Sequence, residues 1–88
     1  MSFISAGRVV ITPNALGQLM PGDIQRGLQR HLAGDWGDLG EEDWQENDSA
    51  LRTGLRLLSS YRSSNGATFW IITESSREVT TLLMPEDY

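Results

Sequence analysis

The residues of this sequence with the most obvious chemical potential are carboxylates, which gather in one stretch. Seven of the twelve acids lie between Asp35 and Asp48, with no Lys or Arg among them. If Asp35 is position one of an EF-hand calcium loop, Gly40 and Glu46 take positions six and twelve, as that motif requires. Positions three and five are a glycine and a leucine, which lack oxygen ligands. We therefore expect no calcium site and no cofactor.

The chain has a single histidine, His31, which is the next candidate for chemistry. Together with Asp35 and Asp38 it could hold a transition metal, because imidazole and carboxylate groups are common ligands. A lone histidine on the apolar side of a helix is more often a packed residue, or lies at the helix end where the dipole favours its charge. We favour this second interpretation and expect no metal site.

Two classes of enzyme can be weighed against the same residues. No serine lies in a G-x-S-x-G elbow, so nothing indicates a serine hydrolase. A small ribonuclease could use His31, Arg56, Tyr61 and Arg62. The net charge of −5 opposes this, because binding to nucleic acid depends on Lys and Arg contacts with phosphates. We expect no catalytic residue and no direct nucleic-acid binding; a ribonuclease-like or metal-dependent enzyme remains the alternative to a binding protein.

The acidic stretch is better suited to contact with a basic partner. Uncompensated carboxylates repel one another, and either solvent or a cationic partner reduces that repulsion. Trp36 lies in the same stretch and either packs over the core or is an exposed anchor at the edge of the acidic surface. The alternative is a solvated face that only keeps the protein soluble. The predicted partner-binding residues are Asp35, Trp36, Asp38, Glu41, Glu42, Asp43 and Glu46.

The first half of the chain predicts one strand and short helices. Residues 8–12 form a β-branched run typical of a strand, and Thr12 can then cap a helix that begins at Pro13. A second helix is expected from a cap at Asp23, with apolar positions at helical spacing as far as Leu32.

The acidic stretch itself predicts a third short helix. Asp38 and Glu41 have the spacing of a capping box, so we expect this helix to begin near Leu39. It would direct Trp44 inward and its carboxylates outward. Another turn could begin at Asp48.

From residue 54 the pattern changes to the period of two that is typical of strands. Asn65-Gly66 predicts a hairpin with a type I′ turn, because both residues tolerate positive φ. Residues 67–74 are rich in aromatic and β-branched side chains and predict a central strand, and residues 78–84 predict another after a turn. The expected fold is α+β: a three- to four-stranded antiparallel sheet with a C-terminal β-meander, covered on one face by short N-terminal helices.

The length and composition indicate the class of protein. Eighty-eight residues predict a single domain, residues 1–88. No apolar run has the roughly 18–20 residues needed to cross a bilayer, and the N-terminus does not resemble a secretory signal. The chain has no cysteine, which suits a reducing compartment. We expect a cytoplasmic protein without membrane contact.

The chain also resembles a family of small, uncharacterised bacterial proteins of plasmids, prophages and other mobile elements. The residues that carry the resemblance are Arg30-His31, Gly34-Asp35-Trp36-Gly37-Asp38, Asp43, Asn47, Ala50-Leu51, Ser59-Ser60-Tyr61, Trp70-Ile71-Ile72-Thr73-Glu74, Arg77, Thr80-Thr81 and Pro85-Glu86-Asp87-Tyr88. The resemblance implies a mobile-element setting and, by analogy, an anti-CRISPR or antirestriction inhibitor of a host nucleic-acid-processing defence complex. Its partner would be a basic surface of a protein or nucleoprotein complex. A dimerising regulatory module, in which a second copy of the chain is the partner, is a further alternative.

Overall fold

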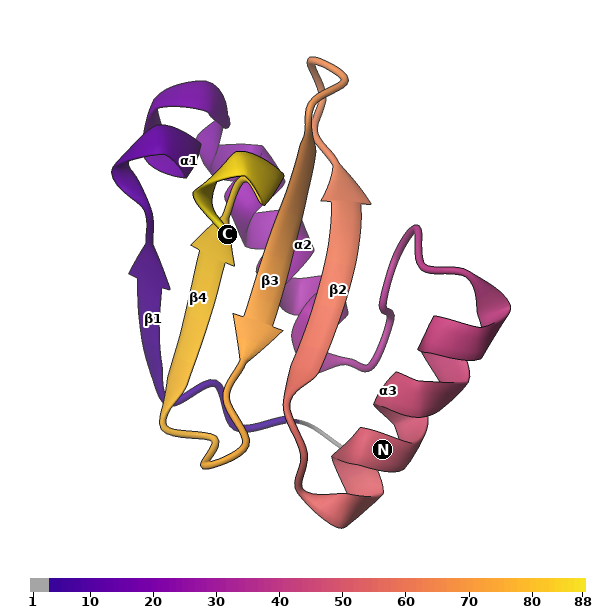
Figure 1. Cartoon of the computed structure of the whole chain (residues 1–88). Helices are drawn as coiled ribbons and strands as arrows, with labels where there is room; N and C mark the ends of the chain where they lie inside the picture. The colour runs from indigo at the N-terminus through magenta and orange to yellow at the C-terminus, as the bar shows by residue number, and fades with distance from the viewer. Residues whose placement is uncertain (1–3) are drawn as a thin grey trace.

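A computed structural model describes residues 4–88 as a four-stranded sheet with helices around it (Figure 1). The elements in chain order are β1 (Arg8–Ile11), α1 (Pro13–Gln18), α2 (Pro21–Leu32), α3 (Glu41–Thr53), β2 (Leu57–Arg62), β3 (Thr68–Thr73), β4 (Val79–Leu83) and a 3-10 helix, η1 (Pro85–Asp87). The predicted α+β class is therefore confirmed.

The sheet is mixed, with the strand order β1-β4-β3-β2. β2, β3 and β4 form the predicted antiparallel meander, but β1 runs parallel to β4, with Arg8 opposite Val79. The prediction of a purely antiparallel sheet was wrong. The reason is that β1 is separated from the meander by all three α-helices, so no hairpin turn joins it to its neighbour and forces an antiparallel pairing.

The β2–β3 hairpin is where the sequence predicted it, but its turn is of another type. Ser63 and Ala67 close the loop through a backbone hydrogen bond of 2.8 Å, and Gly66 donates to Ser63 O. Gly66 has φ +87°, whereas Asn65 does not have positive φ, so the turn is not type I′. The loop instead has the three-residue form in which glycine takes the left-handed position.

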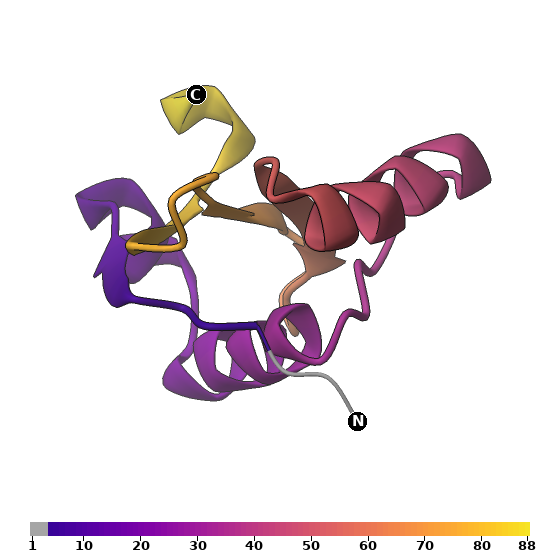
Figure 2. The same cartoon turned by 90° about the horizontal axis from the view of Figure 1, so that it is seen from below.

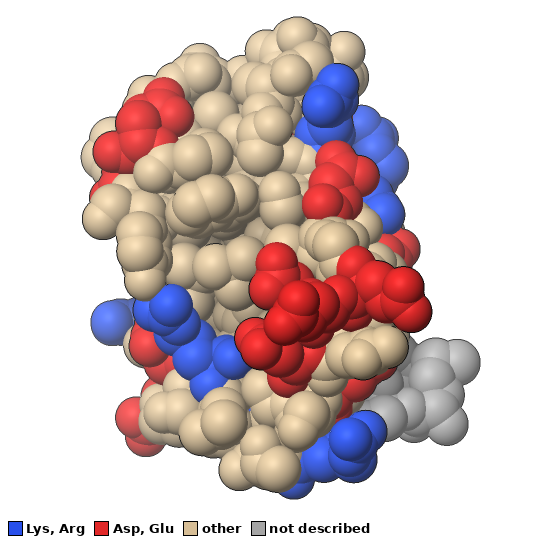
Figure 3. Space-filling model, turned by 45° about the vertical axis from the view of Figure 1, so that its right-hand side comes forward, with Lys and Arg blue, Asp and Glu red and all other residues tan. Residues whose placement is uncertain are grey.

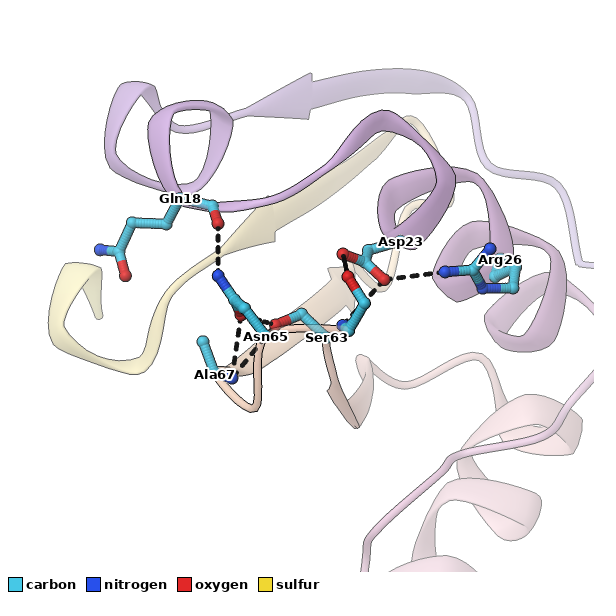
Figure 4. A network of polar contacts seen from close by, with 7 residues as sticks. Gln18, Asp23, Arg26, Ser63, Asn65 and Ala67 are labelled. Atoms are coloured by element: carbon cyan, nitrogen blue, oxygen red, sulfur yellow. Dashed lines mark hydrogen bonds and ion pairs between the residues drawn. The ribbon is translucent and has the colours of Figure 1, made fainter.

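The tip of this hairpin is held against the helices (Figure 4). Asn65 donates from its amide to Gln18 O at 3.2 Å. Ser64 donates from its backbone N–H and its hydroxyl to the two carboxylate oxygens of Asp23, at 3.0 and 2.9 Å. Arg26 pairs with the same carboxylate at 2.8 Å. Asp23 therefore fastens the hairpin rather than capping a helix.

The starts of the helices agree only in part with the sequence-based predictions. Thr12 caps α1 as expected, accepting from Ala15 N–H at 3.1 Å. α2 begins earlier than predicted, because Pro21 already has the φ of a first helical residue. α3 begins later than predicted and runs to Thr53 without interruption, with Gly40 and not Asp38 at its N-cap.

α2 covers one face of the sheet, while η1 lies on the other side and α3 lies beyond the β2 edge (Figures 1 and 2). One buried cluster joins α1 to the sheet and contains Ala15, Leu19, Tyr61, Phe69, Ile71, Leu82 and Met84. A second cluster contains Ile4, Trp36, Ala50 and Leu57, with Trp44 of α3 packed against it as predicted. Trp70 of β3 is only partly buried, with its ring centroid 5.8 Å from that of Tyr88. Among residues 4–88, no helix combines the length and apolar character needed to cross a membrane.

Candidate functional site

A chain of buried polar side chains runs through the interior from His31. Nδ1 of the His31 ring lies 2.6 Å from Ser59 Oγ, and Nε2 lies 2.8 Å from Thr73 Oγ1. Thr73 Oγ1 lies 2.8 Å from Thr80 Oγ1, and the Thr80 hydroxyl donates to Ala6 O at 2.7 Å. The side chains of His31, Ser59, Thr73 and Thr80 are fully buried, and we call them the buried polar chain.

The buried polar chain determines the tautomer of His31. The only hydroxyl proton of Thr80 is donated to Ala6 O, so Thr73 must donate to Thr80. Thr73 then has no proton left for the imidazole, and His31 Nε2–H donates to Thr73. Nδ1 is the acceptor for the Ser59 hydroxyl. His31 is thus a neutral Nε2–H imidazole with both nitrogens satisfied, and burial, assisted by the charge of Arg77, lowers its pKa to about 4.

This geometry gives His31 and Ser59 a structural role. A nucleophile and its base must be reachable by a substrate, whereas both side chains here are 0% exposed. The interpretation of His31 as a packed residue is confirmed. Of the other side chains named for a ribonuclease, Tyr61 is buried and donates to Asp35 O at 2.6 Å, while Arg56 and Arg62 are exposed. Within residues 4–88 there is no group of three His, Cys, Asp or Glu side chains positioned to hold a metal ion.

Trp36 is inside the protein. Its side chain is 0% exposed, its indole N–H donates to Asp48 Oδ1 at 2.9 Å, and its ring meets His31 edge-on at 5.6 Å between centroids. The prediction of Trp36 as a partner-binding anchor is therefore wrong, and the prediction that it packs over the core is right. The cause is the pairing of its backbone with Ser60 of β2, which draws the loop in against the sheet.

The outer edge of β2 is covered by this loop and by α3. Ser60 donates to Trp36 O at 3.1 Å and accepts from Asp38 N–H at 2.7 Å. Asn47 performs the same function for Leu58: its side-chain amide donates to Leu58 O, and its carbonyl oxygen accepts from Leu58 N–H at 3.1 Å. Asn47 thus acts as a substitute strand and fastens α3 to the sheet.

We expect Asn47→Ala to lower the free energy of unfolding by about 2 kcal/mol, because two backbone groups of Leu58 lose their partners. Gln45→Ala is the matched control, since Gln45 is exposed on the same helix and should change stability by less than about 0.5 kcal/mol. Urea unfolding of the two variants measures the difference. Equal stabilities would contradict the role assigned to Asn47.

Most of the predicted acidic residues are on the surface. Asp38, Glu41, Glu42, Asp43 and Glu46 are all exposed, and we call them the acidic patch. Figure 3 shows acidic side chains gathered together on the surface. The ion pairs found within residues 4–88 join Arg26 to Asp23 and Arg30 to Asp35, so neither involves the patch.

Asp35 differs from the acidic patch because it already has a partner within the chain. Its carboxylate pairs with Arg30 at 2.8 Å and accepts from Gly37 N–H at 3.1 Å. The Arg30 hydrogen bond is the main cause that lowers the pKa of the Asp35 carboxyl; burial opposes it, and the Gly37 N–H adds to the lowering. The same guanidinium lies 4.8 Å from the centre of the Tyr61 ring. Asp35 therefore helps to hold the loop before α3.

A groove of about 560 Å³ lies between α3 and β2, bordered by part of the acidic patch. Leu39, Leu55 and Leu58 contribute apolar surface, Asp43 and Glu46 contribute carboxylates from α3, and Arg56 contributes a guanidinium from the connection to β2. We call this the α3–β2 groove. Sequence reasoning named Asp43 and Glu46 but missed the leucines, because no local pattern reveals that α3 packs beside β2.

Similarity to known proteins offers no guide to the groove. Comparison of this chain with protein-family models, with curated proteins and with solved structures finds no match. Function is therefore inferred from the geometry and chemistry of the described residues.

Proposed function

We propose that this protein is a non-enzymatic binding protein that uses the acidic patch to contact a basic surface of a protein or nucleoprotein complex. The observation that carries the proposal is the group of five exposed carboxylates that make no ion pair within residues 4–88. Keeping like charges together has an electrostatic cost, which a cationic surface relieves. Complementary charge also accelerates association and discriminates against wrong partners.

The resemblance to mobile-element proteins supplies the proposed class of target. Host complexes that process nucleic acid hold it through Lys and Arg side chains, which form the electrostatic complement of the acidic patch. We therefore place the protein in the cytoplasm, as an inhibitor that acts by protein–protein contact or by imitating nucleic acid. Its own negative charge disfavours a direct contact with nucleic acid.

Neutralising four of the five carboxylates of the acidic patch should strongly weaken capture of the partner. The variant combines Glu41→Gln, Glu42→Gln, Asp43→Asn and Glu46→Gln, and immobilised wild type and variant are compared as bait in a host lysate. A captured complex is then purified and its binding measured at several salt concentrations. We expect wild-type association to slow as salt rises and the variant to bind at least about tenfold more weakly, chiefly through a slower on-rate.

The control pair is Glu74→Gln with Glu78→Gln, which removes two exposed carboxylates outside the patch. It should bind as wild type does. Glu41, Glu42 and Asp43 lie in the first turn of α3, where each carboxylate stabilises the helix by about 0.3–1 kcal/mol, so circular dichroism must confirm that the variant is folded. A folded variant that captures the same complex with unchanged affinity would refute the proposal.

A further inference from the structure

The α3–β2 groove has the size and lining of a binding site. Its volume of about 560 Å³ lies within the range of about 300–1,000 Å³ found for small ligand sites. Leu55 is 61% exposed at the groove, so an apolar side chain is left facing solvent there. An apolar group of a partner that enters the groove would remove this surface from water.

The walls of the groove are held in place before anything binds. Asn47 joins α3 to Leu58 through two hydrogen bonds. Arg77 holds the other end of the helix: its guanidinium donates to Leu55 O at 2.7 Å and to Ala50 O at 3.2 Å. Since little ordering is needed on binding, even a short segment can bind with useful affinity.

The charges of the groove select the occupant. Asp43 and Glu46 line it from α3 and take part in neither ion pair found in residues 4–88. Arg56 lines it from the segment between α3 and β2. The Arg56 guanidinium donates to the Tyr88 hydroxyl at 2.9 Å, which restrains its position. A cation fits beside the carboxylates, and a carbonyl or carboxylate oxygen fits beside the guanidinium. Acidic side chains on one border of the hollow can be seen in Figure 3.

The mode of binding follows from the covered edge of β2. Leu58 and Ser60 already have backbone partners, so an added strand would find no free groups at these positions. The occupant must therefore insert side chains. We infer that the α3–β2 groove binds a short segment of the partner protein in which a Lys or Arg lies next to an aliphatic side chain. This inference rests on the proposed function and names the element of the basic partner that is recognised.

Three fluorescein-labelled hexapeptides provide the probe. One alternates lysine with leucine, the second lysine with serine, and the third glutamate with leucine. Fluorescence anisotropy should show the lysine–leucine peptide binding at least about tenfold more tightly than either control, because only it supplies both charge and apolar surface. Equal binding of the lysine–serine peptide would mean that charge alone is recognised, and would overturn the inference.

Matched variants locate the site. Asp43→Asn with Glu46→Gln removes two carboxylates that line the groove, whereas Glu41→Gln with Glu42→Gln removes two that lie outside it on the same helix. We expect the first pair to weaken lysine–leucine binding about tenfold and the second by less than about twofold. Leu55→Ser should weaken it, whereas Leu16→Ser, at a leucine that is 62% exposed on α1, should not.

The outcomes separate this inference from the proposed function. If both pairs of carboxylates matter equally, or if none of the peptides binds, the groove is not the recognition site. The acidic patch could then still capture the partner from the lysate, and the proposed function would stand. If the groove binds the peptide but neutralising the patch leaves lysate capture unchanged, the proposed function fails and the groove remains a peptide-binding site.

Discussion

Gly37→Ala is expected to destabilise the protein by roughly 3–5 kcal/mol, which is a large part of the total stability of a domain of this size. Gly37 has φ +77°, and an added Cβ would overlap the carbonyl oxygen of Ser60 and lie 2.6 Å from Cδ1 of Tyr61. The neighbouring backbone cannot move away, because it carries the hydrogen bonds that join the loop to β2. Loss of this junction would also release Trp36 from the interior.

Gly34→Ala is the matched control for this prediction. Gly34 has φ +82°, but an added Cβ would meet nothing within 4 Å. It should therefore cost only the left-handed backbone penalty, about 1–2 kcal/mol. Urea unfolding followed by tryptophan fluorescence measures both variants. Equal losses would show that the close approach of Gly37 to β2 contributes nothing, and would contradict the packing described for the loop.

The elements that the sequence predicted well are those whose signals are local. Alternating and β-branched residues produced the meander, and Thr12-Pro13 correctly indicated the start of α1. The starts of α2 and α3 were misjudged because Asp23 and Asp38 were interpreted as caps. Asp23 is used instead by Ser64 of a distant hairpin, and the backbone of Asp38 is paired with Ser60. A residue that could cap a nearby helix can instead form hydrogen bonds with a residue far away in the sequence. A single sequence does not show which of these partners it has.

The features of the candidate site also divide into those with a local sequence signal and those that depend on long-range contacts. The acidic patch could be predicted, because five carboxylates without nearby cations are favoured at the surface. The sequence left Trp36 open between the core and the surface and did not reveal the groove beside Leu55, since both depend on α3 packing against the edge of β2. The parallel position of β1 is a non-local pairing of the same kind. These features arise from contacts between segments far apart in the chain, which periodicity and spacing do not encode.

Acidification should weaken the protein through its only histidine. Burial lowers the pKa of His31 to about 4, with a smaller contribution from Arg77, whereas an unfolded histidine has a pKa of about 6.5. The unfolded state therefore binds more protons between these values, so stability falls as the pH decreases through this window. The loss should be about 2 kcal/mol between pH 7 and pH 5, and approach about 3 kcal/mol near pH 4.

This prediction can be tested without a resonance assignment, because the chain contains one imidazole. NMR of the folded protein should show a neutral Nε2–H ring that does not titrate between pH 7 and pH 5, as the buried polar chain requires. Urea unfolding over the same range should show the stability loss, and His31→Gln should remove that pH dependence while lowering stability at pH 7. Asp23, Asp35, Glu86 and Asp87 have lowered carboxyl pKa values, so their contributions are lost mainly below pH 5 and do not obscure the change between pH 7 and pH 5. An imidazole that titrates near pH 6.5 in the folded protein would show that His31 is solvated, and the buried polar chain would have to be abandoned.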